Sequence, residues 1–263
     1  MAQSCDRSAR LPCGGRPAAY RDLTQESMIV SDMNPYPGQS GIEVSEAAVR
    51  QYLISVFNLM AMGLVLSGGI AYAAAVSGIY LQLMHTPLMF VVMLAPLGLI
   101  LFLGVRLQKM SVVAVQATYW VFVSLMGLSL GGVFLRYTGQ SMEQVFLITA
   151  GMFGTMSVYG YATRADLSSW GSFLFMGLVG LIIASVVNMF VGSSAASWVI
   201  SVIGVLVFTG YTAYDVNKLK AFAATYGTEG ETAQKGAVMG ALNLYLDFVN
   251  LFLFLLRLMG DRR

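Results

Sequence analysis

The chain has 263 residues, of which 57% are hydrophobic and only 11% are charged. Soluble domains carry about 25% charged residues, so this composition excludes a soluble domain and predicts an all-α, polytopic membrane protein. Charged side chains gather in the first 50 positions, and long stretches after them hold none. The net charge of +2 gives no reason to expect a nucleic-acid partner, because the charges it counts lie mostly beside membrane spans.

The first segment, residues 1–48, is rich in Gly, Pro, Ser and charge and lacks helical periodicity. It also lacks the basic-then-apolar layout of a signal peptide, so we expect no cleavage. We predict a mobile cytoplasmic tail over 1–48, followed by a membrane domain over 49–263.

Apolar windows without charge follow one another after this tail. A membrane helix needs about 20 apolar residues, so the charge-free run 167–214 is too long for one helix, and Gly192 with the two serines after it divides this run. A chain of six spans with a re-entrant last segment is the alternative to seven. The seven spans that we predict are 52–76, 86–105, 112–134, 144–162, 169–190, 197–219 and 235–259.

Lys and Arg near the span ends indicate a cytoplasmic N-terminus, because cytoplasmic loops carry an excess of both. The predicted outer loops hold only Arg136. Arg257, Arg262 and Arg263 count against this orientation, since a seven-span chain places them outside. The inner loops nevertheless carry more Lys and Arg than the outer side does. The predicted inner side holds the larger set: Arg50, Arg106, Lys109, Arg164, Lys218, Lys220 and Lys235.

Glycines at helical spacing predict close contacts between neighbouring helices. Small residues let helix backbones approach each other in lipid, so we expect ordinary helix packing at these positions rather than a pore. The pairs are Gly127 with Gly131, Gly151 with Gly154, and Gly177 with Gly180.

Two aspartates lie inside the last two apolar spans. Asp215 closes the charge-free run 197–214, and Asp247 is the only charge between residues 237 and 256. An ionised carboxylate in a lipid span costs about 2.5–3.5 kcal/mol by insertion scales, so such residues usually face a protein interior or a water path. The polar loop 226–232 lies about midway between them, so an antiparallel hairpin would bring both carboxylates to the same depth.

The two carboxylates are expected to act as one unit. Close carboxylates cannot easily both be ionised, so their protons belong to the pair, and oxygens about 2.5–3.0 Å apart are expected when one proton is shared. Such a pair can sense pH or hold Ca²⁺, which prefers oxygen ligands. Asp215 and Asp247 are therefore the candidate pH sensor, ion path and metal ligands. A structural pair that merely locks two helices together is the alternative.

Polar neighbours support the pair, because polar groups in lipid need partners within the protein. In each span they share a helical face with the aspartate. The last span alone carries such a stripe in its middle, so we expect the other helices to enclose it. The supporting residues are Tyr211 and Thr212 in the sixth span and Asn243 and Asn250 in the seventh.

Two segments resemble the transmembrane Bax-inhibitor motif family: residues 210–219, GYTAYDVNKL, and residues 244–257, LYLDFVNLFLFLLR. The resemblance covers roughly residues 49–260. It implies seven helices around a central last helix, and an aspartate pair that senses pH in a calcium-leak protein of a bacterial inner (plasma) membrane. A bacterial branch also ends its second helix with a basic residue that latches onto the pair, and Arg106 stands at that position. A plain positive-inside anchor is the alternative role for Arg106.

A pH-sensitive calcium (cation) leak channel, and not an enzyme, is the function that this resemblance favours. We expect no tightly bound cofactor, and we expect the lipid bilayer, Ca²⁺ and protons as partners. A non-transporting membrane regulator that binds membrane proteases or cell-death factors is the alternative, and it would need a membrane-protein partner.

An intramembrane aspartyl protease is a remote alternative. That class also places Tyr before one Asp, as Tyr214 precedes Asp215 here. Its second site has Gly-x-Gly-Asp, where this chain has Leu244-Tyr-Leu-Asp, and the Pro-Ala-Leu element that should follow is missing.

Overall fold

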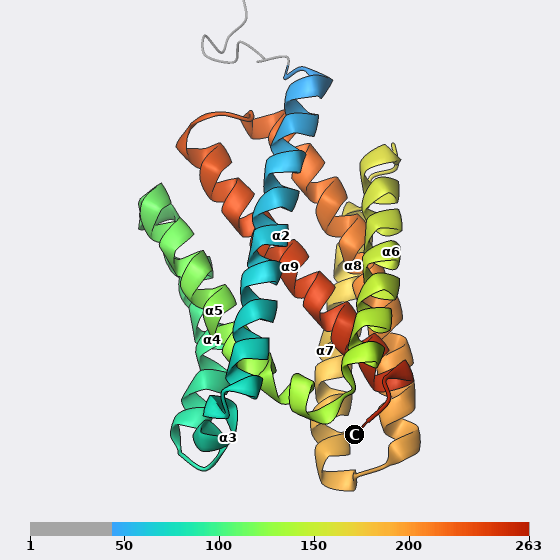
Figure 1. Ribbon diagram of the computed structural model, residues 1–263. Coiled ribbons are helices and arrows are strands. Elements are labelled where there is room, and N and C mark those ends of the chain that lie inside the picture. Colours follow the sequence, from blue (N-terminus) through green and yellow to red (C-terminus); the bar gives the residue numbers. More distant parts are fainter. Residues whose placement is uncertain (1–43, 263) are drawn as a thin grey trace, which may run out of the picture. The chain divides into compact units, whose positions relative to one another are not determined.

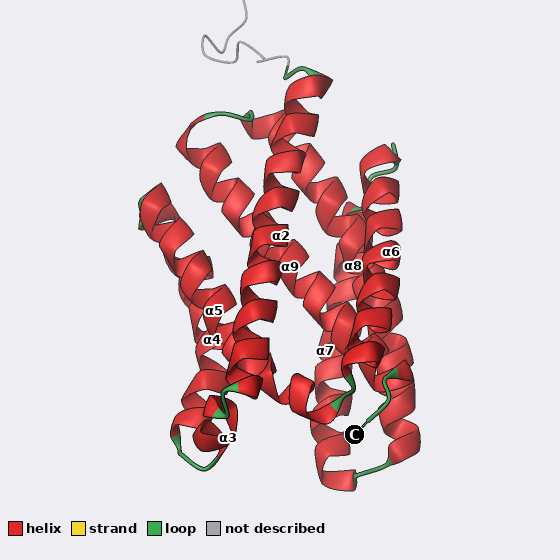
Figure 2. Cartoon of the chain, viewed as in Figure 1, coloured by secondary structure: helices red, strands yellow, loops and turns green. Residues whose placement is uncertain are grey.

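The structure, a computed structural model, describes residues 44–262. The tail predicted over 1–48 lies outside the described residues up to position 43, and the first helix already begins at Glu46. Every regular element of the described chain is a helix (Figures 1 and 2). In chain order these are α2 (Glu46–Val76), α3 (Ile79–Met84), α4 (Leu88–Arg106), the 3-10 turn η1 (Leu107–Lys109), α5 (Val112–Arg136), α6 (Gly139–Ala162), α7 (Ser168–Val191), α8 (Ser194–Tyr226) and α9 (Gly230–Met259).

Seven of these helices are long and apolar enough to cross a membrane: α2, α4, α5, α6, α7, α8 and α9. The prediction of an all-α, seven-span, multi-pass integral membrane protein is therefore confirmed. The sequence pattern missed α3, which fills most of the turn expected between the first two spans. The break at Gly192 is confirmed, and its positive φ of 70° is a conformation that suits glycine.

The last helix runs the length of the bundle and does not re-enter. It has 30 residues, so at 1.5 Å per residue it spans about 45 Å, more than the hydrocarbon core. Its end is bound to the turn between α5 and α6. The backbone N–H of Thr138 donates to the carbonyl of Asp261 (3.1 Å), and the N–H of Asp261 donates to Oγ of Ser141 (2.9 Å).

The central position of α9 is confirmed. It packs against α2, α5, α6 and α8, and crosses the bundle obliquely in Figure 1. Of its most apolar window 67% is buried, against at most 33% in any other span. A span that carries an ionisable side chain in its middle is expected to face the interior of the bundle, and α9 is enclosed by its neighbours in this way.

The helix α4 is enclosed far less than α9. Among the membrane spans it packs mainly against α5, and Pro96 in its middle cannot donate a backbone hydrogen bond. Most of its side chains are exposed on the surface that lipid would cover. It is therefore held in the bundle mainly by one neighbouring span, as α7 is by α8.

The loop between α8 and α9 is shorter than the predicted 226–232. It contains only residues 227–229, and the glycines at its two edges, Gly227 and Gly230, have φ values of 82° and 89°. Left-handed backbone of this kind favours glycine, which allows the chain to reverse within a few residues.

The predicted close contacts between helices at glycines are present at only some of the positions. A Cβ on Gly127 would lie 2.9 Å from Cα of Ser67, and Gly131 and Gly177 also lie against side chains. The prediction is wrong for Gly151, Gly154 and Gly180, which have open space beside them. The sequence pattern missed Gly160, where α6 crosses α8 and a Cβ would lie 3.0 Å from Cα of Ala213.

Replacement of Gly160 by Val should separate α6 from α8. We expect a loss of about 1–3 kcal/mol in unfolding free energy, because backbone atoms cannot move aside as a flexible side chain can. Thermal unfolding of the purified protein in detergent measures the change. Gly151→Val is the matched control on the same helix, and equal losses in the two variants would show that the crossing is not tightly packed.

Candidate functional site

The two aspartates line one cavity of about 390 Å³ between α7, α8 and α9. Asp215 is 8% exposed and Asp247 is 4% exposed, so both carboxyl groups are buried. Asp247 lies further from the α8–α9 loop along its helix than Asp215 does, and the oblique path of α9 allows both to reach the same cavity (Figure 1). Sharing of one proton between them remains a prediction.

A second cavity of about 510 Å³ leads from this pair toward the α8–α9 loop. Its loop end is lined by Glu231 and Lys235, which form an ion pair of 2.7 Å. Asp215, Lys218 and Asn243 line both cavities, so the two spaces adjoin at these three side chains. Asp215 therefore lies at the inner end of a hollow that begins at one end of the bundle, and Asp247 lies in the adjoining cavity.

Three of the four predicted supporting residues line the cavity of the pair: Tyr211, Asn243 and Asn250. The Asn250 amide donates to the carbonyl of Leu246 (2.8 Å), which leaves its oxygen available to the cavity. Thr212 does not line either hollow. It is fully buried, and its hydroxyl donates to the carbonyl of Phe208 on its own helix (2.9 Å).

Asp247 carries the polar atom that most needs a partner. Its Oδ2 is buried, and no hydrogen-bond donor reaches it from the described part of the chain. A buried carboxylate oxygen without a donor is costly unless a proton, a water molecule or a cation supplies the missing contact. A cation there would meet two carboxylates and the amide oxygens of Asn243 and Asn250, all of them oxygen ligands.

Arg106 lies away from the pair. It is exposed at the end of α4, and no ion pair with either aspartate forms within residues 44–262. The two residues after it, Leu107 and Gln108, line the second cavity instead. The latch therefore remains a prediction that requires α4 to move.

Lys218 is the cation beside Asp215, although its place in the sequence was taken only as a sign of orientation. It lies one helical turn after Asp215, lines both cavities, and holds its ammonium 5.8 Å from the centre of the Tyr214 ring. The sequence could have shown this, because residues three positions apart on a helix are neighbours, and Lys218 follows Asp215 at that spacing.

Lys220 holds α8 in place. Its ammonium donates to the carbonyl of Tyr161 (2.8 Å) and lies 3.5 Å from that of Thr163, at the C-terminal end of α6. A cation is favourable there, because the last carbonyls of a helix carry partial negative charge. The Asn217 amide adds a bond of 3.3 Å to the carbonyl of Gly160.

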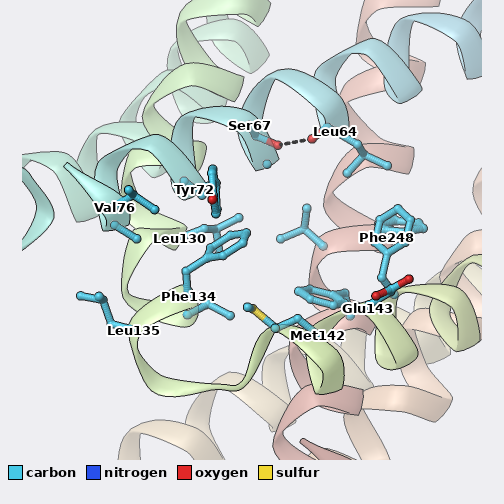
Figure 3. Close-up of a pocket in the computed structure, with 18 residues that line it drawn as sticks. Leu64, Ser67, Tyr72, Val76, Leu130, Phe134, Leu135, Met142, Glu143 and Phe248 are labelled. Carbon is cyan, nitrogen blue, oxygen red and sulfur yellow. Dashed lines mark hydrogen bonds between the residues drawn. The ribbon is translucent and has the colours of Figure 1, made fainter. Parts of the chain in front are cut away.

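A third hollow of about 580 Å³ lies on the opposite face of α9, between α2, α5, α6 and α9. Figure 3 shows its mostly apolar lining, in which Glu143 is the one carboxylate and the Ser67 hydroxyl donates to Leu64 (3.2 Å). Phe248 lies at one side of this hollow, in edge contact with Phe146 and Phe153. Since Asp247 and Phe248 are adjacent, α9 itself separates the two sides.

The comparison with known families identifies the chain. The family model described as inhibitor of apoptosis-promoting Bax1 matches residues 49–263. The chain belongs to this family. The match begins close to the start of α2 and covers all seven spans.

Relatives from several bacteria match over nearly their full length. An Escherichia coli K12 protein named inner membrane protein YbhL is 40% identical over 234 residues, which cover 88% of this chain and 100% of the relative. An uncharacterized protein of Rickettsia prowazekii, RP147, is 43% identical over 83% of this chain and 92% of its own length. An uncharacterized protein of Caulobacter vibrioides is 42% identical over 83% and 91%.

A cysteine at position 243 should react with a small, water-soluble thiol reagent. Asn243 lines both hollows, whereas the next residue, Leu244, is fully buried. In a background with Cys5 and Cys13 replaced by serine, we expect Asn243→Cys to react at least about tenfold faster than Leu244→Cys, because only an accessible thiolate reacts. Mass spectrometry of timed samples gives both rates. Equal rates would mean that water does not reach the pair by this route.

Proposed function

We propose that the protein is a pH-sensitive cation leak, with Ca²⁺ as the transported ion and Asp215 with Asp247 as its sensor. One observation carries the proposal: both buried carboxylates line a hollow that adjoins another leading to the end of the bundle. Ionisable groups inside a membrane bundle mark ion and proton pathways by default. The proposal assigns no enzymatic step and no tightly bound cofactor.

The helix α4 is the proposed gate. Among the membrane spans it packs mainly against α5, it contains Pro96, and the residues directly after it line the cavity. Arg106 at its end stays cationic at any relevant pH. A doubly ionised pair attracts both Arg106 and Ca²⁺, and a singly protonated pair attracts each less strongly, so protonation sets how far Arg106 and α4 are drawn inward.

The opposite side of the path is closed by α9. An ion that reached Asp247 would still have to pass the packed rings of Phe146, Phe153 and Phe248 to enter the hollow near Glu143. Conduction therefore needs a shift of α9 relative to α2 and α6, in addition to the movement of α4.

Replacement of Asp215 or Asp247 by Asn should abolish the pH dependence of Ca²⁺ flux. The amide has nearly the same shape but cannot titrate, so the remaining carboxylate loses its coupled partner. In the same assay Arg106→Ala should raise the basal leak. Flux from proteoliposomes, measured with a Ca²⁺-sensitive dye across a pH series, tests both statements.

The control for this series is Asp166→Asn, which removes an exposed carboxylate in the loop between α6 and α7. It should leave the pH profile of the flux unchanged. If both pair variants keep a normal pH profile, the pair is structural and the mechanism is wrong.

The regulator alternative rests on the family description, which names inhibition of a cell-death protein. Such a regulator would need a membrane-protein partner and would carry no ions itself. Absence of Ca²⁺ flux from proteoliposomes that contain correctly folded protein would favour it.

We propose that the N-terminal end of α2 and the α8–α9 loop face the cytoplasm of a bacterial cell, across its inner membrane. The E. coli relative is named an inner membrane protein. Within the described residues, the opposite end of the bundle carries Arg136, Arg257 and Arg262. The end with the α8–α9 loop carries more cations, as the positive-inside rule requires: Arg50, Arg106, Lys109, Arg164, Lys218, Lys220 and Lys235.

Cysteine labelling in intact cells tests this orientation. In the background without Cys5 and Cys13, a membrane-impermeant maleimide should label Thr86→Cys, in the exposed turn before α4, and should spare Glu229→Cys, in the exposed α8–α9 loop. Permeabilised cells should show labelling of both. The reverse pattern in intact cells would overturn the orientation.

A further inference from the structure

A cavity of about 560 Å³ lies at the end of the bundle away from the aspartate pair. Its walls come from α3, α5 and α9 and are mostly apolar, but two arginines, Arg136 and Arg257, also line it. The proposed leak does not use these two arginines. The proposed orientation does not explain them either, since it places both on the outer side of the membrane, where Lys and Arg are disfavoured.

Both guanidinium groups are exposed, and no anionic side chain of the described residues pairs with them. No acidic side chain lines the cavity, and neither arginine forms an ion pair within residues 44–262. Ser129 also lines it, but its hydroxyl donates to the carbonyl of Val92 (2.9 Å). Arg257 lies over the ring of Phe254, 5.4 Å from its centre, which orients the guanidinium. Two like charges that face one partly apolar space favour an anion between them.

The position of the cavity indicates which class of anion would bind there. Arg136 is the last residue of α5, and Arg257 lies in the last turn of α9, so both are at the level where a membrane helix meets the head groups. The cavity wall formed by α3 includes the exposed side chains of Leu81 and Met84. A ligand here would therefore meet charge at one end and apolar surface along its length.

We propose that this cavity binds an anionic phospholipid, with the phosphodiester between Arg136 and Arg257 and an acyl chain along α3 and the apolar face of α9. Arginine is well suited to phosphate, because its planar guanidinium donates two parallel hydrogen bonds. The lipid would link α5 to α9 close to the turn that already holds the C-terminal segment through Thr138 and Asp261. The site is independent of the proposed leak.

Native mass spectrometry of the purified full chain with added phosphatidylglycerol tests the proposal. We expect the wild type to retain one phosphatidylglycerol in preference to phosphatidylcholine, and R136Q/R257Q to bind it roughly tenfold more weakly, because two charge-assisted contacts are lost. The control is Arg164→Gln, an exposed arginine at the opposite end of the bundle, which should bind normally. If the double variant fails to fold, R136K/R257K keeps the charge, and its selectivity for phosphatidylglycerol should persist at lower affinity.

Competition distinguishes a lipid from a free anion. Inorganic phosphate at millimolar concentration should not displace the bound phosphatidylglycerol, because it makes no contact with the apolar walls. Complete displacement would overturn the lipid assignment. Equal retention of phosphatidylglycerol by the wild type and R136Q/R257Q would overturn the site itself.

Discussion

The position of two carboxylates inside a lipid-spanning bundle constrains the rest of this structure. Asp215 and Asp247 cannot face hydrocarbon without a large cost, so the helix that carries Asp247 must be surrounded by protein. The helices α2, α5, α6 and α8 provide that enclosure, and close packing of side chains, rather than apolar character, holds helices together in lipid. The hollow beside the pair follows from the same arrangement, since polar side chains leave space that water or a cation can fill.

The cations of the bundle divide into distinct roles. Lys220 caps the end of α6 and holds α8 in place, whereas Lys218 shares two cavities with Asp215. Arg106 is exposed at the end of α4, which packs mainly against α5, and a small movement there would change its distance from the pair. Arg136 and Arg257 face a different cavity at the far end of the bundle. Charge counting along the chain treats all of these residues as equivalent, but their neighbours make them different.

Much of the fold was predictable because the membrane imposes simple rules on length and charge. The seven spans followed from apolar windows, and the central place of α9 followed from its polar stripe in mid-span. The tight loop of residues 227–229 was missed, because local pattern does not reveal where a helix continues beyond its apolar segment. The helix α3 was missed because six residues are too few for a helical period to show. The prediction of close packing at the glycine pairs was only partly correct, since spacing cannot show whether a helix face meets a neighbouring helix or lipid. Gly151 has open space beside it, whereas Gly160 lies against another helix.

The sequence by itself determined the class of protein, the number of spans and the two aspartates, because a charge in an apolar run is costly wherever the helices pack. Only the tertiary structure decided which polar residues accompany the pair. Asn243 reaches both hollows, whereas Thr212, on the predicted face of its own helix, donates to its own backbone. It also decided that Arg106 lies away from Asp215, since that depends on where α4 packs in the bundle, whereas Lys218 lies beside Asp215 because both are on α8, three residues apart. The place of a helix in the bundle arises from packing between side chains far apart in the chain, which no local pattern records.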